Sequence, residues 1–262
     1  MQILNVKVMR GPNYWSNFRK HLIVIKLDIS GLEEYPTNKI EGFYERLSNL
    51  LPSLYQHRCS EGKEGGFFQR VKDGTWAGHV VEHVALEIQS LAGMDCGYGR
   101  TRSAGKKGIY YVVFAYEIEK AGLHAGNAAI RIVEKLISGQ PVSIEQDLQV
   151  LRDIKKTHTL GPSTFAIVSE ATRRGIPHKR INNGSLILFG QGVNQRKIRA
   201  TASSMTSLIG AESACDKEET KKILSTAFIP IPHGAVAKNK EELISAIERT
   251  GFPLDIIQIK FL

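Results

Sequence analysis

The sequence predicts an α+β domain over residues 1–160 and a smaller α/β unit over residues 161–262. Three observations support this division. Runs of β-branched and aromatic residues predict strands in the first part. Apolar residues that recur every three or four positions predict helices between and after them. Finally, the turn residues THTLGP at 157–162 follow a charge-rich helical pattern and indicate a boundary.

The elements of the first domain follow from local patterns. Residues 3–8 alternate by two and residues 21–27 are rich in β-branched side chains, so both are expected to be strands. Residues 42–51 form an amphipathic helical pattern that ends at Pro52. The remaining expected elements are a helix over 75–91, a loop rich in Gly and Arg over 93–108, a strand over 109–118, and helices over about 121–138 and 143–156.

The second part alternates helical and strand patterns. Residues 164–174 read as a helix and residues 185–189 (SLILF) as a short buried strand. A capped helix is expected over 216–225 and another helix over 240–250. Helices alternating with strands predict an α/β unit.

Composition excludes several classes of protein. The chain has 262 residues, 35 Lys and Arg against 26 Asp and Glu, and a formal net charge of +9. No apolar run is long enough for a membrane span, and the first residues lack the pattern of a signal peptide. Three widely separated cysteines fit a reducing cytoplasm, so we expect a cytoplasmic location. The positive charge is spread along the chain without interleaved aromatic residues, so no nucleic-acid partner is expected.

One motif has the residue types and spacing that catalytic chemistry needs. His79, Glu82 and His83 form H-x-x-E-H within the predicted helix over 75–91, and spacings of three and four place them on one helix face. Two imidazoles one turn apart can share a Zn²⁺ ion, and the carboxylate between them can take a proton from the attacking water. The alternative interpretation is two histidines hydrogen-bonded in a polar cleft without a metal.

A catalytic zinc site needs a third protein ligand. Glu87 lies one turn beyond His83, while Glu117 and Glu119 share a face near the end of the strand expected over 109–118. The pattern does not choose among these three; we adopt Glu117 as the working prediction. Arg100, in the Gly-rich loop, is the further catalytic candidate, because a guanidinium there can bind a substrate carboxylate or stabilise an oxyanion. Arg102 is better explained as ordinary loop charge.

Several long blocks resemble cyanophycin synthetases. They include RGPNYWS at 10–16, the stretch from LPSLYQHRC to CGYGRTR at 51–102, GIYYVVFAYEIEKAG at 108–122 and LGPSTFAIVSEATRRGIP at 160–177. The blocks run in the family's order and cover residues 1 to about 253.

The resemblance implies a three-part enzyme. Family members join an N-terminal domain, an ATP-grasp domain that adds Asp through an acyl phosphate, and a Mur-ligase-like domain that attaches Arg. Their product is the storage polymer cyanophycin. In some members the N-terminal domain is a metallopeptidase-like site that trims the polymer into primers, and its H-x-x-E-H matches His79, Glu82 and His83. The resemblance thus implies that residues 161–262 are the incomplete opening subdomain of an ATP-grasp fold.

The chain departs from the family at two places. From residue 254 it reads LDIIQIKFL, where the family continues toward a glycine-rich phosphate-binding loop. ATP and Mg²⁺ are therefore expected only in the full-length family, and ligase activity is expected to be lost here. Phe228 also stands where the family has glycine in an A-G-I-P turn, and a bulky residue is costly there if φ is positive.

Two functions follow as expectations. The first is residual zinc-dependent hydrolysis of cyanophycin by the N-terminal domain of a truncated synthetase, with the polymer or its primers as partner. The second is a non-catalytic module that binds the polymer or builds a homo-oligomer.

Overall fold

The computed structural model describes residues 1–254 and divides the chain into two compact units. The first unit spans Met1–Thr159 and the second begins at Leu160. Within the described residues, no helix combines the length and apolar character needed to cross a bilayer. The family-divergent stretch noted after residue 254 lies outside the described residues.

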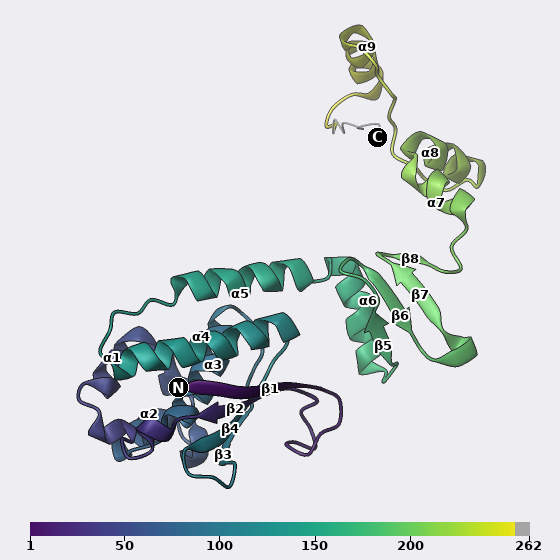
Figure 1. Ribbon diagram of the computed structural model, residues 1–262. Coiled ribbons are helices and arrows are strands. Elements are labelled where there is room, and N and C mark those ends of the chain that lie inside the picture. Colours follow the sequence, from purple (N-terminus) through teal and green to yellow (C-terminus); the bar gives the residue numbers. More distant parts are fainter. Residues whose placement is uncertain (255–262) are drawn as a thin grey trace. The chain divides into compact units, whose positions relative to one another are not determined.

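A four-stranded antiparallel sheet organises the first unit (Figure 1). Its order is β1 (Gln2–Arg10), β2 (His21–Asp28), β4 (Ile109–Ala115) and β3 (Gly99–Ser103). Strand β3 was expected to be loop. This prediction was wrong, because the sequence GRTRS has no apolar run and becomes a strand only by pairing with β4.

Helices cover one face of this sheet. They are α1 (Phe43–Leu50), α2 (Gly66–Asp73), α3 (Ala77–Leu91), α4 (Glu119–Ile137) and α5 (Glu145–His158), with short 3-10 helices at Ser30–Leu32, Thr37–Lys39, Pro52–Gln56 and Cys59–Glu61. Helices α3 and α4 pack against each other and against the sheet. Ile23, Ile25 and Phe114 from the sheet join Val84 and Ile132 from the helices in a continuous buried core.

The opposite face of the sheet has a smaller apolar cluster. Leu22, Val24, Val113 and Ala115 form it, and partly buried residues including Trp15 and Tyr111 pack against it. Trp15 belongs to the loop between β1 and β2 and meets the Tyr111 ring edge to face at 5.6 Å between centroids.

A buried carboxylate ties α5 to α4. Asp147 is 6% exposed; its Oδ1 lies 3.1 Å from His124 Nε2, and its Oδ2 accepts a hydrogen bond from Arg131 Nη2 at 2.5 Å. Because a buried carboxylate requires such partners, these contacts fix α5, the last helix of the first unit, against α4.

The second unit is built on a second antiparallel sheet of order β5-β6-β7-β8. Its elements are α6 (Pro162–Arg173), β5 (His178–Arg180), β6 (Leu186–Phe189), a 3-10 turn at Gly192–Asn194, β7 (Arg196–Arg199), β8 (Ala202–Ser203), α7 (Leu208–Cys215), α8 (Lys217–Thr226) and α9 (Lys240–Thr250). The one strand expected here, over 185–189, is thus one of four.

Phe228 adopts the conformation that makes its bulk costly. Its φ is 55°, in the left-handed region, and its side chain is 95% exposed. A residue other than glycine is strained at this φ, so the concern raised by the sequence is confirmed.

Candidate functional site

Helix α3 places the three residues of the motif on one face, as the sequence predicts. The helix begins after Trp76, which is extended, and most of its residues are buried. Glu82 and His83 are 4% and 6% exposed, unusual values for polar side chains. Val80, Val84 and Ile88 lie in the apolar core and anchor the helix.

A cysteine completes a donor cluster with the two histidines. Cys59 begins a 3-10 turn with φ of 52°, and its Sγ lies 3.3 Å from His79 Nε2. One donor atom from each of Cys59, His79 and His83 lies within 4.8 Å of the others. Among the described residues this is the group of His, Cys, Asp and Glu whose geometry suits a metal ion.

Hydrogen bonds orient the nitrogen of each ring that faces away from the cluster. His79 Nδ1 lies 2.9 Å from Thr75 Oγ1. His83 Nδ1 lies 2.8 Å from His57 Nδ1. Because these contacts occupy both Nδ1 atoms, the Nε2 lone pairs are left for the cluster, which is the arrangement that metal-binding histidines need.

The charge of Glu87 determines which nitrogens of His57 and His83 carry a hydrogen. His57 Nε2 lies 2.6 Å from Glu87 Oε2, and Ser53 donates to Glu87 Oε1. Burial would raise the Glu87 pKa, but the bonds from His57 and Ser53 outweigh it, so that pKa is lowered and Glu87 is ionised. An ionised carboxylate only accepts. His57 therefore donates from Nε2 to Glu87, and a neutral His57 then accepts at Nδ1 from His83.

Glu82 is held beside the cluster. Thr101 on β3 donates to its Oε2 at 2.6 Å, and its Oε1 lies 3.9 Å from His83 Nε2. Gly99 backs the carboxylate so closely that a Cβ there would lie 2.3 Å from Oε1. Burial raises the pKa of Glu82 to about 7, against the Thr101 bond and the charges of Arg102 and Arg100. A carboxyl with this pKa can exchange a proton near neutral pH.

The two histidines are neutral. Burial, with a smaller contribution from the Arg70 charge, lowers the pKa of His79 to about 4. Burial, His79 and His57 together lower the pKa of His83 well below its usual value. Neutral imidazoles keep the lone pairs with which they bind metals.

The structure places the three glutamates considered as third zinc ligand outside the donor cluster. Glu117 accepts from the backbone amide of Asp95 at 2.9 Å and does not belong to the donor cluster. Glu119 pairs with exposed Arg10. Glu87 contacts the donor cluster only through His57, which lies between it and His83.

Arg100 is exposed on β3. Because its neighbour Thr101 points to Glu82, Arg100 points to the opposite face of the sheet.

Sequence reasoning missed Cys59, His57 and the hydroxyls of Thr75 and Thr101. Cys59 and His57 lie about twenty residues before the motif in short turns without periodicity. The available signal was the close pairing of a histidine and a cysteine in QHRC, since both residue types are common metal ligands.

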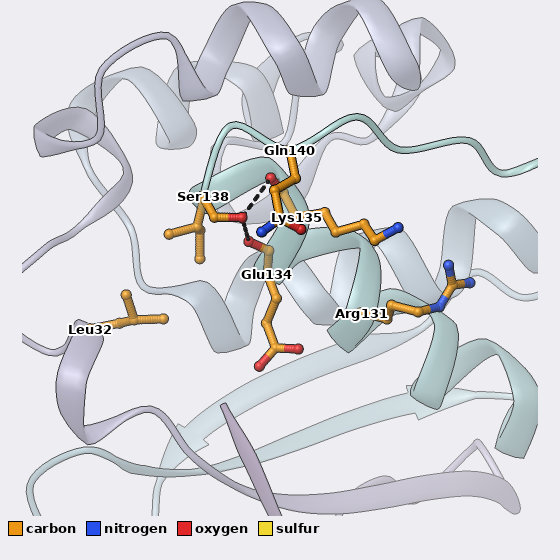
Figure 2. Close-up of a pocket in the computed structure, with 7 residues that line it drawn as sticks. Leu32, Arg131, Glu134, Lys135, Ser138 and Gln140 are labelled. Carbon is orange, nitrogen blue, oxygen red and sulfur yellow. Dashed lines mark hydrogen bonds between the residues drawn. The ribbon is translucent and has the colours of Figure 1, made fainter.

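A separate hollow lies at the end of α4. It has a volume of about 390 Å³ and is lined by Leu32, Arg131 and residues from Glu134 to Gln140, around the end of α4. In Figure 2, Ser138 bonds backward to the carbonyls of Glu134 and Lys135 and closes the helix end. The hollow shares no residue with the donor cluster and holds no comparable constellation, so we do not assign the site to it.

The donor set fits a zinc ion. A thiolate and two imidazole nitrogens are the soft and borderline donors that Zn²⁺ binds, and catalytic zinc sites use three protein ligands. Fold and cluster together define a class: an α+β domain with a candidate metal centre formed by helix α3 and the 3-10 turn at Cys59.

Comparisons with known proteins find similarity to cyanophycin synthetases. Residues 23–138 match the family model described as the cyanophycin synthase-like N-terminal domain. The chain is 48% identical over 260 residues to cyanophycin synthetase of Trichormus variabilis, 48% over 254 residues to that of Synechocystis sp., and 47% over 260 residues to that of Crocosphaera subtropica. Residues 23–138 therefore form a cyanophycin synthase-like N-terminal domain, and the resemblance seen in the sequence is confirmed.

The matches cover nearly all of this chain but less than a third of each relative. They include 98%, 96% and 98% of this chain, but only 29%, 29% and 30% of the respective relatives. The chain thus corresponds to the N-terminal part of much longer synthetases.

Proposed function

We propose that the first unit is a zinc-dependent peptidase that cleaves cyanophycin. The observation that supports this most directly is the convergence of Cys59, His79 and His83 beside the buried carboxyl of Glu82. His79, His83 and Cys59 would hold the ion, with Cys59 as the third ligand in place of the predicted Glu117. A bound Zn²⁺ supplies Lewis-acid polarisation of a carbonyl oxygen.

The protein's own residues have distinct tasks in this reaction. Glu82 is the general base that takes the proton of the attacking water and later passes it to the leaving amine. Thr101 holds the carboxylate in place through Oε2, which leaves Oε1 toward His83. Glu87 and His57 keep His83 in the tautomer with its Nε2 lone pair free.

The decisive experiment combines metal content with product release. Purified chain should contain about one zinc per molecule and release short β-Asp-Arg chains from cyanophycin. Glu82→Gln should lower the rate about 100- to 10,000-fold while leaving zinc bound. Glu119→Gln, which changes an exposed ion pair outside the donor cluster, is the matched control and should retain full rate.

Two results would contradict the proposal. One is cyanophycin cleavage that persists after zinc is removed with a chelator. The other is a zinc-loaded chain that does not act on cyanophycin.

A second candidate is a module that binds cyanophycin without cleaving it. The exposed Arg100 and Arg102 favour it, because guanidinium groups recognise carboxylates. Binding that is insensitive to chelators, without product, would support this alternative; assembly of the unit as a homo-oligomer is compatible with either function.

For the second unit we propose the opening subdomain of an ATP-grasp fold. Support comes from the sequence resemblance from residue 160 onward and from the 98% coverage of this chain in the match to a synthetase. In the whole protein, ATP with Mg²⁺ would serve the ligase chemistry. If this chain shows ATP-dependent addition of Asp or Arg to a primer, ligase activity is not confined to the longer proteins.

A further inference from the structure

Strand β3 is an edge strand of the first sheet and lies directly beside the candidate catalytic carboxyl. Its only described partner is β4, and no described strand pairs with its other side. Thr101, in the middle of β3, donates to Glu82. An open strand edge therefore runs next to the donor cluster.

The register shows which backbone groups this edge presents. Ala115 donates to the carbonyl of Tyr98, and Ala104 donates to that of Ile109, at the two ends of the β3–β4 ladder. In an antiparallel pair, hydrogen-bonded and non-bonded positions alternate. Arg100 and Arg102 therefore bond to β4. The N–H and C=O groups of Gly99, Thr101 and Ser103 point away from the sheet.

The two faces of β3 differ in chemistry. Gly99 and Thr101 lie against Glu82 on the side of α3. Arg100 and Arg102 lie on the other face, opposite Val113 and Tyr111 of β4. Both arginines are exposed, and neither forms an ion pair with any described carboxylate.

The positive charge continues across the same face of the sheet. In the cross-strand rows, Tyr111 stands opposite Lys26 on β2, and Val24 stands opposite Lys7 on β1. Residues directly opposite each other in a sheet share a face. Two rows, each with a lysine and an arginine, therefore present cations without a carboxylate partner among the described residues, and Lys26 Nζ lies 5.9 Å from the centre of the Tyr111 ring. The carboxylate of Asp28, at the end of this face, is bonded to Ser30.

We propose that the free edge of β3 binds an extended acidic peptide as an added strand, with its backbone paired to Gly99, Thr101 and Ser103 and its carboxylates on Arg100 and Arg102. This inference rests on the proposed peptidase function and names how its substrate is held. Addition of a strand to an open edge gives affinity through backbone bonds and specificity through alternate side chains. The charge of the face selects the acidic class.

Because side chains alternate between the two faces of a strand, one added strand would reach both the arginines and Glu82. Side groups at every second position point toward Arg100 and Arg102, and the positions between them point toward α3. A peptide bound this way lies alongside Glu82. The bare backbone of Gly99 is needed there, because a Cβ would strike the Glu82 carboxylate.

The test uses a labelled ten-residue oligo-aspartate and fluorescence anisotropy with the zinc-loaded full chain carrying Glu82→Gln, so that binding is measured without cleavage. Arg100→Ala and Arg102→Ala should each weaken binding about tenfold, as expected for the loss of a charged hydrogen-bonding partner. Arg152→Ala, at another exposed arginine, on α5, is the matched control and should change the affinity little.

A proline tests the backbone contacts separately from charge. Ser103→Pro removes an N–H that points away from β4, so it should leave the sheet intact and weaken binding about fivefold. Ser103→Ala keeps that N–H and should bind as before. In hydrogen exchange, bound oligo-aspartate should slow the amides of Gly99, Thr101 and Ser103 and leave those of Arg100 and Arg102 unchanged.

Three results would overturn the inference: no protection of those three amides, equal binding by Ser103→Pro and Ser103→Ala, or tighter binding of a ten-nucleotide oligo-dT than of oligo-aspartate. These outcomes are separate from those of the proposed function. A chain that lacks zinc and cleaves nothing, yet shows the protection pattern, contradicts the peptidase and supports the docking edge. A chain that cleaves cyanophycin but shows no protection of these amides supports the peptidase and contradicts the docking edge.

Discussion

The helices of the first unit are held by a continuous apolar core, whereas the last three helices of the second unit are capped by their own side chains. Ser207, Asp216 and Asn239 accept backbone N–H bonds at the starts of α7, α8 and α9. Helices α1 to α5 show no such side-chain cap in the described structure. Local capping thus accompanies a lack of tertiary burial.

Burial makes the same contrast. Among described residues of the second unit, the buried ones are Thr164, Ala171, Ile187, Ile198 and Ala246. Large apolar side chains remain exposed there, with Val193 at 94% and Met205 at 78%. Since helices draw most of their stability from packing, the first unit should be much harder to unfold than the second.

The largest expected effect is a cavity in the core of the first unit. Phe43 is fully buried, and Phe43→Ala should cost about 3–5 kcal/mol of unfolding free energy. Phe165→Ala, at a position 59% exposed in the second unit, should cost less than about 0.5 kcal/mol. Urea unfolding followed by tryptophan fluorescence reports the first unit, because both tryptophans, Trp15 and Trp76, lie in it, and helix loss followed by circular dichroism reports the second unit as well. Equal losses would erase the contrast between the units.

The next effect is a pH dependence confined to the first unit. The pKa of Glu82 rises from 4.5 to about 7 on folding. Its stabilising contribution is therefore complete below pH 4.5 and is lost as pH rises through 7, by about 3 kcal/mol in the metal-free chain.

Glu82→Gln stays neutral and should avoid this loss, so metal-free variant and wild type should differ in stability at pH 8 and agree near pH 4. Urea unfolding at both values measures it. His79 titrates in both proteins and cancels in the difference. A constant offset at all pH values would show that the titration of Glu82 is not responsible.

A smaller effect should distinguish the capped helices. Asp216 accepts from the amides of Glu218 and Glu219, and Asp216→Ala should destabilise α8 by about 1 kcal/mol. Hydrogen exchange of α8 amides should speed up while tryptophan fluorescence is unchanged. Asp216→Asn keeps an accepting oxygen and is the matched control. Unchanged exchange in the alanine variant would mean that packing, not the cap, holds α8.

The smallest effect is a gain. Phe228→Gly relieves the positive φ and should stabilise the second unit by about 0.5–1 kcal/mol. Phe228→Ala keeps the Cβ and should give no comparable gain. Thermal unfolding followed by circular dichroism compares the two variants, and an equal gain would assign the effect to the loss of the exposed ring.

Elements whose structure is determined by neighbouring residues were predicted from the sequence, and elements that depend on distant partners were not. The helix expected over 75–91 is observed as Ala77–Leu91, and the strand over 21–27 as His21–Asp28, since both follow from the periodicity of neighbouring residues. Strand β3 and helix α2 escaped prediction. The sequence of β3 is polar, and its extended form depends on pairing with β4.

The site residues also divide into those predictable from local spacing and those brought in by the tertiary fold. His79, Glu82 and His83 share a helix, so spacing alone predicted that they meet. Cys59 reaches them from a 3-10 turn with positive φ, and no sequence period encodes that approach. Glu87 was among the candidates for third ligand, and its role changed because His57 lies between it and His83.

The grip of His124 and Arg131 on Asp147 has a practical consequence. It keeps α5 attached to the domain that precedes it, so the chain can be divided after Thr159 without removing a packed helix. A protease acting in the connection near Leu160 should release the first unit as an intact fragment. That fragment would carry the complete donor cluster and the β3 edge, and it could be transferred as a cassette onto an unrelated protein.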